Sequence, residues 1–234
     1  MNNNVKEILV GITKGAISAV PYVGGALNEF LFEIRGRIAQ ERINKFVDCF
    51  IQYIEDMGTP IDEEVLTSEN FNDMYVSIIK QVIECKSQYK IDIFKRILES
   101  NLRINYESDF RDTFLELVSK LDYMEFEILN MFKDSGRSGS MDITEGTDGC
   151  VSMTTSMSCR KEIISRIKEC NTEINTLEAV EKYEFYICDL ISKSLLVDGK
   201  TVGNTHRDLS KEGLTYLYIT VFGKEFLRFV QMYD

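Results

Sequence analysis

The apolar positions at the start of the chain predict two helices joined by a tight turn. Between Val5 and Val20 the apolar residues recur at intervals of three and four, as on one face of a helix. The sequence Pro-Tyr-Val-Gly-Gly at 21–25 is typical of a turn, and Ala26 to Asp56 can continue as one long helix that ends at Met57 and Gly58. We therefore expect an N-terminal helical hairpin.

Further helical stretches follow in the next part of the chain. Ser68 is a suitable N-cap residue, and an apolar stripe follows it at Phe71, Met74, Tyr75, Ile78, Ile79 and Val82. The same spacing predicts helical stretches from Gln88 to Asn105 and from Ser108 to Lys133, the second with a stripe at Phe110, Phe114, Leu117, Val118 and Leu121. Because each stripe needs a partner to cover it, we expect a helical bundle.

The segment from Asp134 to Met157 has a different composition. It is rich in Ser, Gly and Thr and has no sustained apolar period, which predicts a long loop or a linker. Its glycines do not form the Gly-x-x-x-x-Gly-Lys-Ser/Thr phosphate-binding motif, and no strong strand pattern precedes them. A solvated loop is the better interpretation.

The last part of the chain predicts helices and a small ribbon. Helical spacing covers Ser158 to Cys170 and then Asn175 or Thr176 to Ser194, and strand-like alternation follows at Leu195–Thr201 and Leu214–Thr220. Helical spacing resumes from Gly223 to Met232. With a helix at 123–133, the order of these elements is that of a winged helix.

The predicted fold class is therefore mainly α, in two domains. The first, at 1–122, holds the helical hairpin and the bundle, and the second, at 123–234, is a winged-helix-like domain that contains the flexible loop at 134–157.

The charge of the chain argues against a general role in binding nucleic acid. Its formal net charge is −11, with 27 Lys and Arg against 38 Asp and Glu, whereas affinity for phosphate backbones comes largely from Lys and Arg. In a winged helix the helix at 176–194 would read DNA, but its acidic residues outnumber its lysines. A DNA-binding regulator is therefore a disfavoured alternative.

The residue types that enzymes require are sparse. The one histidine, His206, falls in the polar tip of the predicted ribbon, and the acidic residues fit solvated helix faces. The six cysteines show neither Cys-x-x-Cys nor zinc-ligand spacing, and the start of the chain lacks the pattern of a secretory signal. We predict no enzyme activity, no cofactor, no metal, no small-molecule substrate and a cytoplasmic location.

The hairpin is the candidate functional element. Between Lys14 and Glu29 lie fourteen uncharged residues, too few to span a bilayer, and the most basic stretch of the chain follows at 33–45. An apolar segment beside basic residues is typical of interfacial membrane binding. The residues predicted to contact a membrane or a partner are Ile12, Ile17, Val20, Tyr22, Val23, Leu27, Phe30, Arg35, Arg37 and Arg42. The alternative is a buried hairpin whose arginines pair with acidic residues elsewhere.

Four segments carry a resemblance to a known family: the hairpin at 16–47, then 89–102, 114–132 and the C-terminal stretch at 216–230. They resemble bacterial proteins of the abortive infection alpha type, in which a helical hairpin precedes a helical region and a winged-helix-like unit ends in Thr-x-x-Gly-x-x-Phe. Here that motif is Thr220, Gly223 and Phe226, where Thr220 can cap the following helix and Phe226 can pack inward. The chain departs from the family at 134–157. The resemblance implies a role in defence against phage.

Two hypotheses of function follow. The first is a non-enzymatic defence effector or regulator that acts through protein contacts, with the hairpin at 8–34 as its active or membrane-directed element, recruited to the inner membrane and its anionic surface. The second is an interaction module that uses the winged-helix-like domain to bind a protein partner or a second copy of itself.

Overall fold

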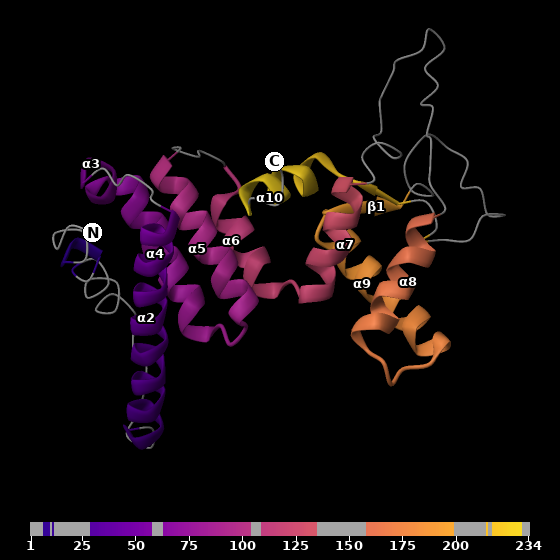
Figure 1. Cartoon of the computed structure of the whole chain (residues 1–234), viewed down its shortest axis with the longest axis horizontal. Helices are drawn as coiled ribbons and strands as arrows, with labels where there is room; N and C mark the ends of the chain where they lie inside the picture. Colours follow the sequence, from indigo (N-terminus) through magenta and orange to yellow (C-terminus); the bar gives the residue numbers. More distant parts are fainter. Residues whose placement is uncertain are drawn as a thin grey trace, which may run out of the picture. The chain divides into compact units, whose positions relative to one another are not determined.

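The computed structural model describes residues 7–9, 11, 29–57, 63–103, 109–134, 158–198, 214 and 217–230. These residues are mainly helical, with a two-stranded antiparallel sheet near the C-terminal end, which confirms the predicted fold class at this level (Figure 1). The chain divides into two compact units, Met1–Lys120 and Leu121–Asp234. Each unit is described by itself.

Helix α4 is the centre of the first unit, which contains α2 (Glu29–Met57), α3 (Glu63–Thr67), α4 (Glu69–Glu84), α5 (Gln88–Arg103) and α6 (Arg111–Lys120). It contacts each of the other four. Ser68 caps its first turn by accepting a hydrogen bond from the Phe71 backbone N–H, and all six residues of the predicted stripe are buried. Both the predicted cap and the predicted stripe are confirmed.

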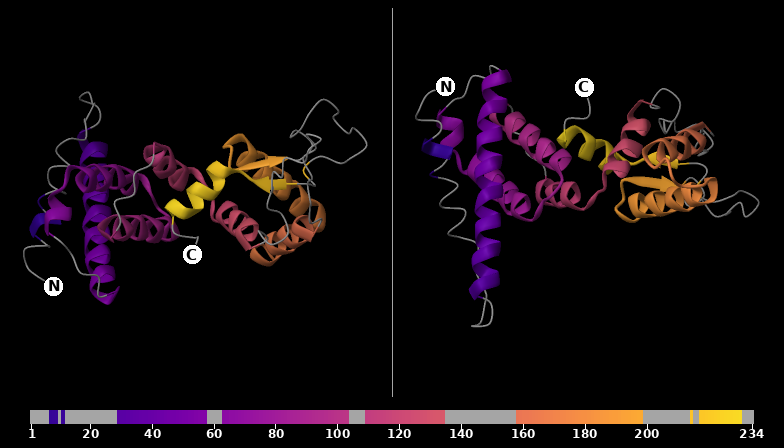
Figure 2. Two further views of the ribbon diagram at one scale, coloured as in Figure 1. Left: turned by 90° about the horizontal axis from the view of Figure 1, so that it is seen from above. Right: turned by 60° about the horizontal axis from the view of Figure 1, so that its bottom comes forward.

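Helix α2 is much longer than its neighbours. Among its described side chains, at 36–56, the buried residues are Ile43, Phe46, Val47, Phe50, Ile51 and Ile54, and the helix contacts α4 and α5. Figures 1 and 2 show that its N-terminal part extends beyond α4 and α5. The prediction of one long helix here is confirmed from Glu29 onward. The predicted turn at 21–25 and most of the helix before it lie outside the described residues, although 7–9 and 11 are helical and Leu9 is buried.

The predicted helical stretch from Ser108 to Lys133 is interrupted. Helix α6 ends at Lys120, and after Leu121 and Asp122 the chain begins α7 (Tyr123–Asp134) in the second unit. The break has a local cause, because the Asp122 backbone N–H donates to Glu125 Oε2 at 2.7 Å, a contact that marks a new helix start. Phe110, predicted as part of the apolar stripe, precedes α6 and is 44% exposed, so that prediction is wrong.

The second unit follows the predicted order of helices and ribbon. After α7 come α8 (Ser158–Cys170), α9 (Thr176–Ser192), β1 (Leu196–Asp198), β2 (Leu217–Ile219) and α10 (Val221–Phe229). Its core gathers side chains from all of these elements, and α7 contacts α8, α9, β2 and α10. The rings of Phe126 on α7 and Phe226 on α10 lie 5.9 Å apart, which confirms that Phe226 packs inward.

Strands β1 and β2 are described over three residues each, and positions 199–201 and 215–216 of the predicted strands lie outside the described residues. The two strands pair antiparallel, with Leu196 opposite Ile219 and Asp198 opposite Leu217. Leu214, predicted as the start of the second strand, instead has a left-handed backbone with φ of 59°, and its N–H donates to Asp198 Oδ2 at 3.0 Å. That prediction was wrong because this side-chain hydrogen bond, invisible in the apolar pattern, holds Leu214 in a turn.

Helix α10 begins at Val221, two residues earlier than predicted, with Thr220 as its N-cap. The Thr220 hydroxyl accepts a hydrogen bond from the Gly223 N–H at 2.8 Å and donates to the Ser194 carbonyl at 2.6 Å. The expected capping role of Thr220 is confirmed, and the same side chain joins the start of α10 to the end of α9.

Candidate functional site

Helix α9 has one buried side and one exposed side that is partly apolar. Ala179, Tyr183, Ile187 and Leu190 face the core. On the opposite side Leu177 is 68% exposed and Phe185 is 63% exposed, and Glu181, Glu184 and Cys188 are exposed between and beside them. Because these residues recur at intervals of three and four, they share one side of the helix. We name this surface, made of Leu177, Glu181, Glu184, Phe185 and Cys188, the outer face of α9.

Local interactions fix the direction of α9. Asn175 and Glu178 form a reciprocal capping box, in which the Glu178 N–H donates to Asn175 Oδ1 at 3.0 Å and the Asn175 N–H donates to Glu178 Oε2 at 2.8 Å. On the inner side, the Tyr183 hydroxyl donates to the Leu214 carbonyl at 2.7 Å. The helix therefore begins at a defined residue and is held against the ribbon.

The lysines of α9 are used inside the unit, which leaves its outer face acidic. Lys182 donates to Asn171 Oδ1 at 3.3 Å, and Lys193, the C-cap residue, forms an ion pair with Asp189. A cation does lie beside Glu184, since Arg160 of α8 approaches it at 3.7 Å and covers the Tyr183 ring at 5.4 Å. A helix with this charge pattern is poorly suited to the phosphates of DNA.

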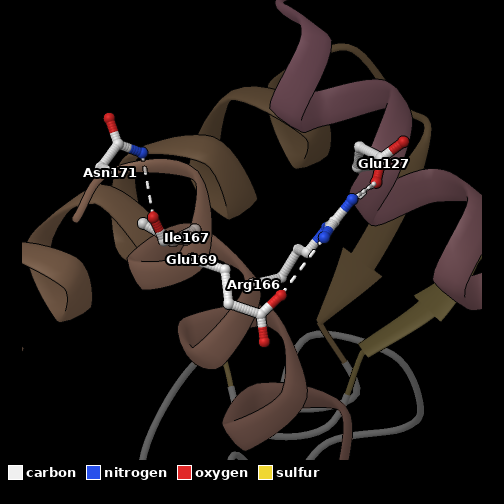
Figure 3. A network of polar contacts seen from close by, with 5 residues as sticks. All are labelled: Glu127, Arg166, Ile167, Glu169 and Asn171. Carbon is white, nitrogen blue, oxygen red and sulfur yellow. Dashed lines mark hydrogen bonds and ion pairs between the residues drawn. The ribbon is translucent and has the colours of Figure 1, made fainter.

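Figure 3 shows how α8 is tied to α7. The Arg166 guanidinium donates to Glu127 Oε2 from Nη2 at 3.1 Å and from Nε at 3.3 Å, and to Glu169 Oε2 from Nη1 at 3.2 Å. These two carboxylates raise the pKa of Arg166, so the group stays charged. At the end of α8, the Asn171 side-chain amide donates to the Ile167 carbonyl at 2.9 Å. The network positions α8, whose Arg160 reaches the edge of the outer face of α9.

A buried carboxyl group joins α7 to α9. Glu125 is 2% exposed, and burial raises its pKa to about 7, helped by a hydrogen bond with Asp189 and by the charge of that residue. Asp189 shows the opposite direction: the hydrogen bond with Glu125 and the nearby Lys193 lower its pKa. Burial raises the pKa of Tyr186, and the nearby carboxyl groups of Asp122 and Glu125 raise it further.

The hydrogen bonding of Glu125 indicates where the proton lies. Its Oε2 accepts from the Asp122 N–H, whereas no donor among the described residues reaches its buried Oε1. Two carboxylates cannot share a hydrogen bond unless one is protonated. With its raised pKa, Glu125 is the member of the pair that takes up a proton first as pH falls, whereas the lowered pKa of Asp189, beside Lys193, keeps that carboxyl ionised. At 2% exposure this carboxyl is shielded from substrates, so we interpret the pair as a contact between helices.

The structure describes few of the residues predicted in the hairpin. Ile12, Ile17, Val20, Tyr22, Val23 and Leu27 lie outside the described residues, and Phe30 and Arg35 lie on α2 with side chains that are likewise not described. Arg37 is exposed, and its neighbour Ile38 is 43% exposed. Arg42 is half-buried and donates to the Ile83 carbonyl, at the end of α4, at 2.5 Å. His206, the candidate base, also lies outside the described residues.

Beside Arg42 the first unit has a cavity of about 340 Å³, which we name the α2 groove. It lies between α2 and the turn from α4 to α5, and its lining includes Arg42, Lys45, Phe46, Cys49, Cys85 and Lys86. Of the predicted site residues that the structure describes, Arg42 alone lines it. Sequence reasoning identified Arg42 but missed Lys86, which is distant in sequence and carries no pattern of its own.

Sequence reasoning also missed the outer face of α9. The signal was present, because Leu177 and Phe185 fall outside the stripe of Ala179, Tyr183, Ile187 and Leu190. Two large apolar residues on the polar side of one amphipathic helix mark it as a candidate contact surface.

Comparisons with protein-family models, with curated proteins and with solved structures find no match to this chain. No group of His, Cys, Asp and Glu side chains among the described residues is arranged to hold a metal ion. Within the same residues, no helix has both the length and the apolar character needed to cross a bilayer.

Proposed function

We propose that this chain is a non-enzymatic interaction protein whose C-terminal unit binds a protein partner through the outer face of α9. The observation that supports this proposal is that Leu177 and Phe185 are more than half exposed on a helix whose opposite side is buried. Contact of two such apolar side chains with water is unfavourable in free energy, and burial against a partner would remove that contact. The resemblance to abortive infection alpha proteins implies antiphage defence as the setting of this contact.

The charges of the outer face define the partner's chemistry. Glu181 and Glu184 lie between the two apolar side chains, and the nearby lysines are engaged within the unit. A complementary surface has Lys or Arg around a central apolar contact, because like charges brought together would be unfavourable. This charge pattern favours a basic protein segment over DNA, whose phosphates would be repelled.

The test replaces the two exposed apolar residues. The double variant Leu177→Gln/Phe185→Gln keeps good helix formers at both positions, so its circular dichroism should match that of the original chain. In a phage-sensitive bacterial host it should lose at least about tenfold in protection, measured as efficiency of plating, since each buried apolar anchor contributes roughly 1.5–3 kcal/mol.

The matched control is Val221→Gln, which removes an 83% exposed apolar side chain on α10 that does not belong to the outer face. This variant should protect as well as the original chain. A photo-cross-linker at position 185, but not at 221, should join one partner of basic character. A folded double variant with full protection would contradict the contact surface, and an original chain that protects against no phage would contradict the defence setting.

Action of the hairpin at 8–34 on a membrane is the second candidate. The observation in its favour is that Arg37 and Ile38, which lie on α2 three and four positions after the hairpin, are both exposed, so basic and apolar groups reach solvent together. Purified protein mixed with anionic vesicles should release a trapped dye, and Ile17→Asp and Leu27→Asp should abolish that release. Equal leakage with the folded variants would remove this candidate.

A further inference from the structure

The α2 groove differs in charge from the chain as a whole. Its lining contains three cations, Arg42, Lys45 and Lys86, and one anion, Glu41, which gives a local net charge of +2 in a chain of −11. Among the described residues Lys45 and Lys86 form no ion pair. In a protein with this excess of carboxylates, cations gathered around one hollow create a local field that attracts anions.

Arg42 is held in place for such a ligand. Its Nη1 donates to the Ile83 carbonyl, which fixes the guanidinium beside the end of α4. A guanidinium has five N–H donors in a rigid fork, so this bond leaves further donors for the oxygens of a phosphate. The groove also includes Gln88, the first residue of α5, and the first turn of α5 contains no acidic residue to neutralise the positive end of the helix dipole.

The rest of the lining is apolar or weakly polar. Phe46 is 1% exposed and forms part of the lining with Ile91, Cys49 and Cys85, while Ile38 adds a side chain that is 43% exposed. A simple inorganic ion would leave these groups uncovered. An apolar surface beside a cationic one suits a ligand that carries an anionic head on an apolar body.

We propose that the α2 groove binds a phosphate group carried on an apolar body. A dianionic phosphate matches three cations better than a single carboxylate does, and the volume is at the lower end of the range of ligand sites, roughly 300–1,000 Å³. Such a phosphate occurs on lipids and on soluble metabolites. The site is independent of the outer face of α9, so its failure would leave the proposed function standing.

Binding is tested with three soluble probes and the full chain. Titration calorimetry compares inorganic phosphate, dihexanoyl phosphatidic acid below its micelle concentration, and dihexanoyl phosphatidylcholine, whose headgroup has no net charge. Phosphatidic acid should bind saturably and phosphatidylcholine should not. Tighter binding of phosphatidic acid than of inorganic phosphate would support a phosphate on an apolar body, as on a lipid, whereas equal affinity would show that the groove takes the phosphate alone and would overturn the apolar part of the proposal. Absence of saturable binding by both phosphates would overturn the proposal.

The variant Lys45→Gln/Lys86→Gln should weaken phosphatidic acid binding by at least about tenfold, because it removes two charge-assisted contacts. Its control, Lys80→Gln/Lys120→Gln, removes the same charge from α4 and α6, outside the groove lining, and should bind as the original chain does. Unchanged binding by the groove variant would overturn the proposal.

The cysteines provide a readout that needs no variant. Cys49 and Cys85 line the groove, while Cys170 and Cys188 are exposed in the second unit. Bound phosphatidic acid should slow alkylation of Cys49 and Cys85 by iodoacetamide several-fold, as followed by peptide mass spectrometry, and leave Cys170 and Cys188 unchanged. If saturating ligand leaves the alkylation rates of all four thiols unchanged, the ligand binds elsewhere.

Discussion

Gly223 lies where the ribbon meets α10, and its lack of a side chain is required there. A Cβ at this position would be 2.4 Å from the Leu195 carbonyl oxygen and 2.9 Å from Ile219 Cγ1. The first of these neighbours is backbone and cannot rotate away. The glycine of the Thr220, Gly223 and Phe226 motif therefore allows close packing, while Thr220 caps the helix and Phe226 fills the core.

Replacing Gly223 by Ala should lower the free energy of unfolding of the C-terminal unit by about 2 kcal/mol, because the backbone must shift to relieve the overlap. Urea denaturation with hydrogen-exchange mass spectrometry of the 217–230 peptides measures the effect. Gly36→Ala is the control, since a Cβ there meets nothing within 4 Å. That helical substitution should be neutral or should stabilise by up to about 1 kcal/mol. A harmless Gly223→Ala would show that the close approach is absent.

For single residues, helix caps could be predicted from the sequence, whereas contacts between residues distant in sequence could not. Ser68 and Thr220 were identifiable because a hydroxyl residue preceded an apolar helical pattern, and both caps are present. The left-handed Leu214 and the buried Glu125 were not identifiable, because each depends on a partner distant in sequence, Asp198 and Asp189 respectively. A periodic pattern contains no information about such pairs.

Between elements, the Glu125 contact makes the packing of α7 on α9 sensitive to pH. The ordinary pKa of a glutamate is about 4.5, and burial raises the pKa of Glu125 to about 7 in the folded unit, so the folded state binds more protons between these pH values. The unfolding free energy therefore falls as pH rises from about 4.5 to 7. The depressed pKa of Asp189 acts below this window, where its contribution to stability is lost as pH falls.

The variant Glu125→Gln should remove this dependence. The Gln amide can still donate a hydrogen bond to Asp189 but cannot titrate, so stability between pH 5 and 7 should vary less than in the original chain by about 2 kcal/mol. Urea denaturation at a series of pH values measures it. The control is Glu173→Gln, an exposed residue, which should keep the original slope. Parallel pH profiles for the original chain and Glu125→Gln would refute the shared proton.

For whole elements, apolar periodicity predicted α4, α5, α8 and α9 closely because each buries a single stripe. Apolar periodicity did not separate α6 from α7. The helical spacing of apolar residues continues across Leu121 and Asp122, although α6 ends at Lys120 and α7 begins at Tyr123. For α9, the prediction considered only the charges of the helix. They disfavoured DNA binding, but the exposed Leu177 and Phe185 on the acidic side were overlooked. Comparing each exposed apolar residue with the buried stripe would have found the candidate contact surface.

For the whole molecule, the division at Lys120 and Leu121 gives each unit its own core and its own candidate surface. The first unit carries the α2 groove, and the second carries the outer face of α9. The sequence predicted a mainly helical chain with a C-terminal ribbon, and the expected domain boundary between 122 and 123 rested on the order of the elements, because no composition shift marks the division itself. The junction lies between two apolar helices, whereas the most evident change in composition begins at Asp134.

The length of α2 has a mechanical consequence. Ile43, the first buried residue among the described side chains of α2 (36–56), lies fourteen positions after Glu29, the first residue of the helix, and at 1.5 Å per residue this is about 21 Å of helix. A tilt of about 10° at the packed end would displace the start of α2 by about 4 Å. The α2 groove includes Arg42 and Phe46, which lie next to Ile43 on the packed part of α2. A small rearrangement of side chains around an occupant would thus be amplified at the end of α2 that joins residues 8–28.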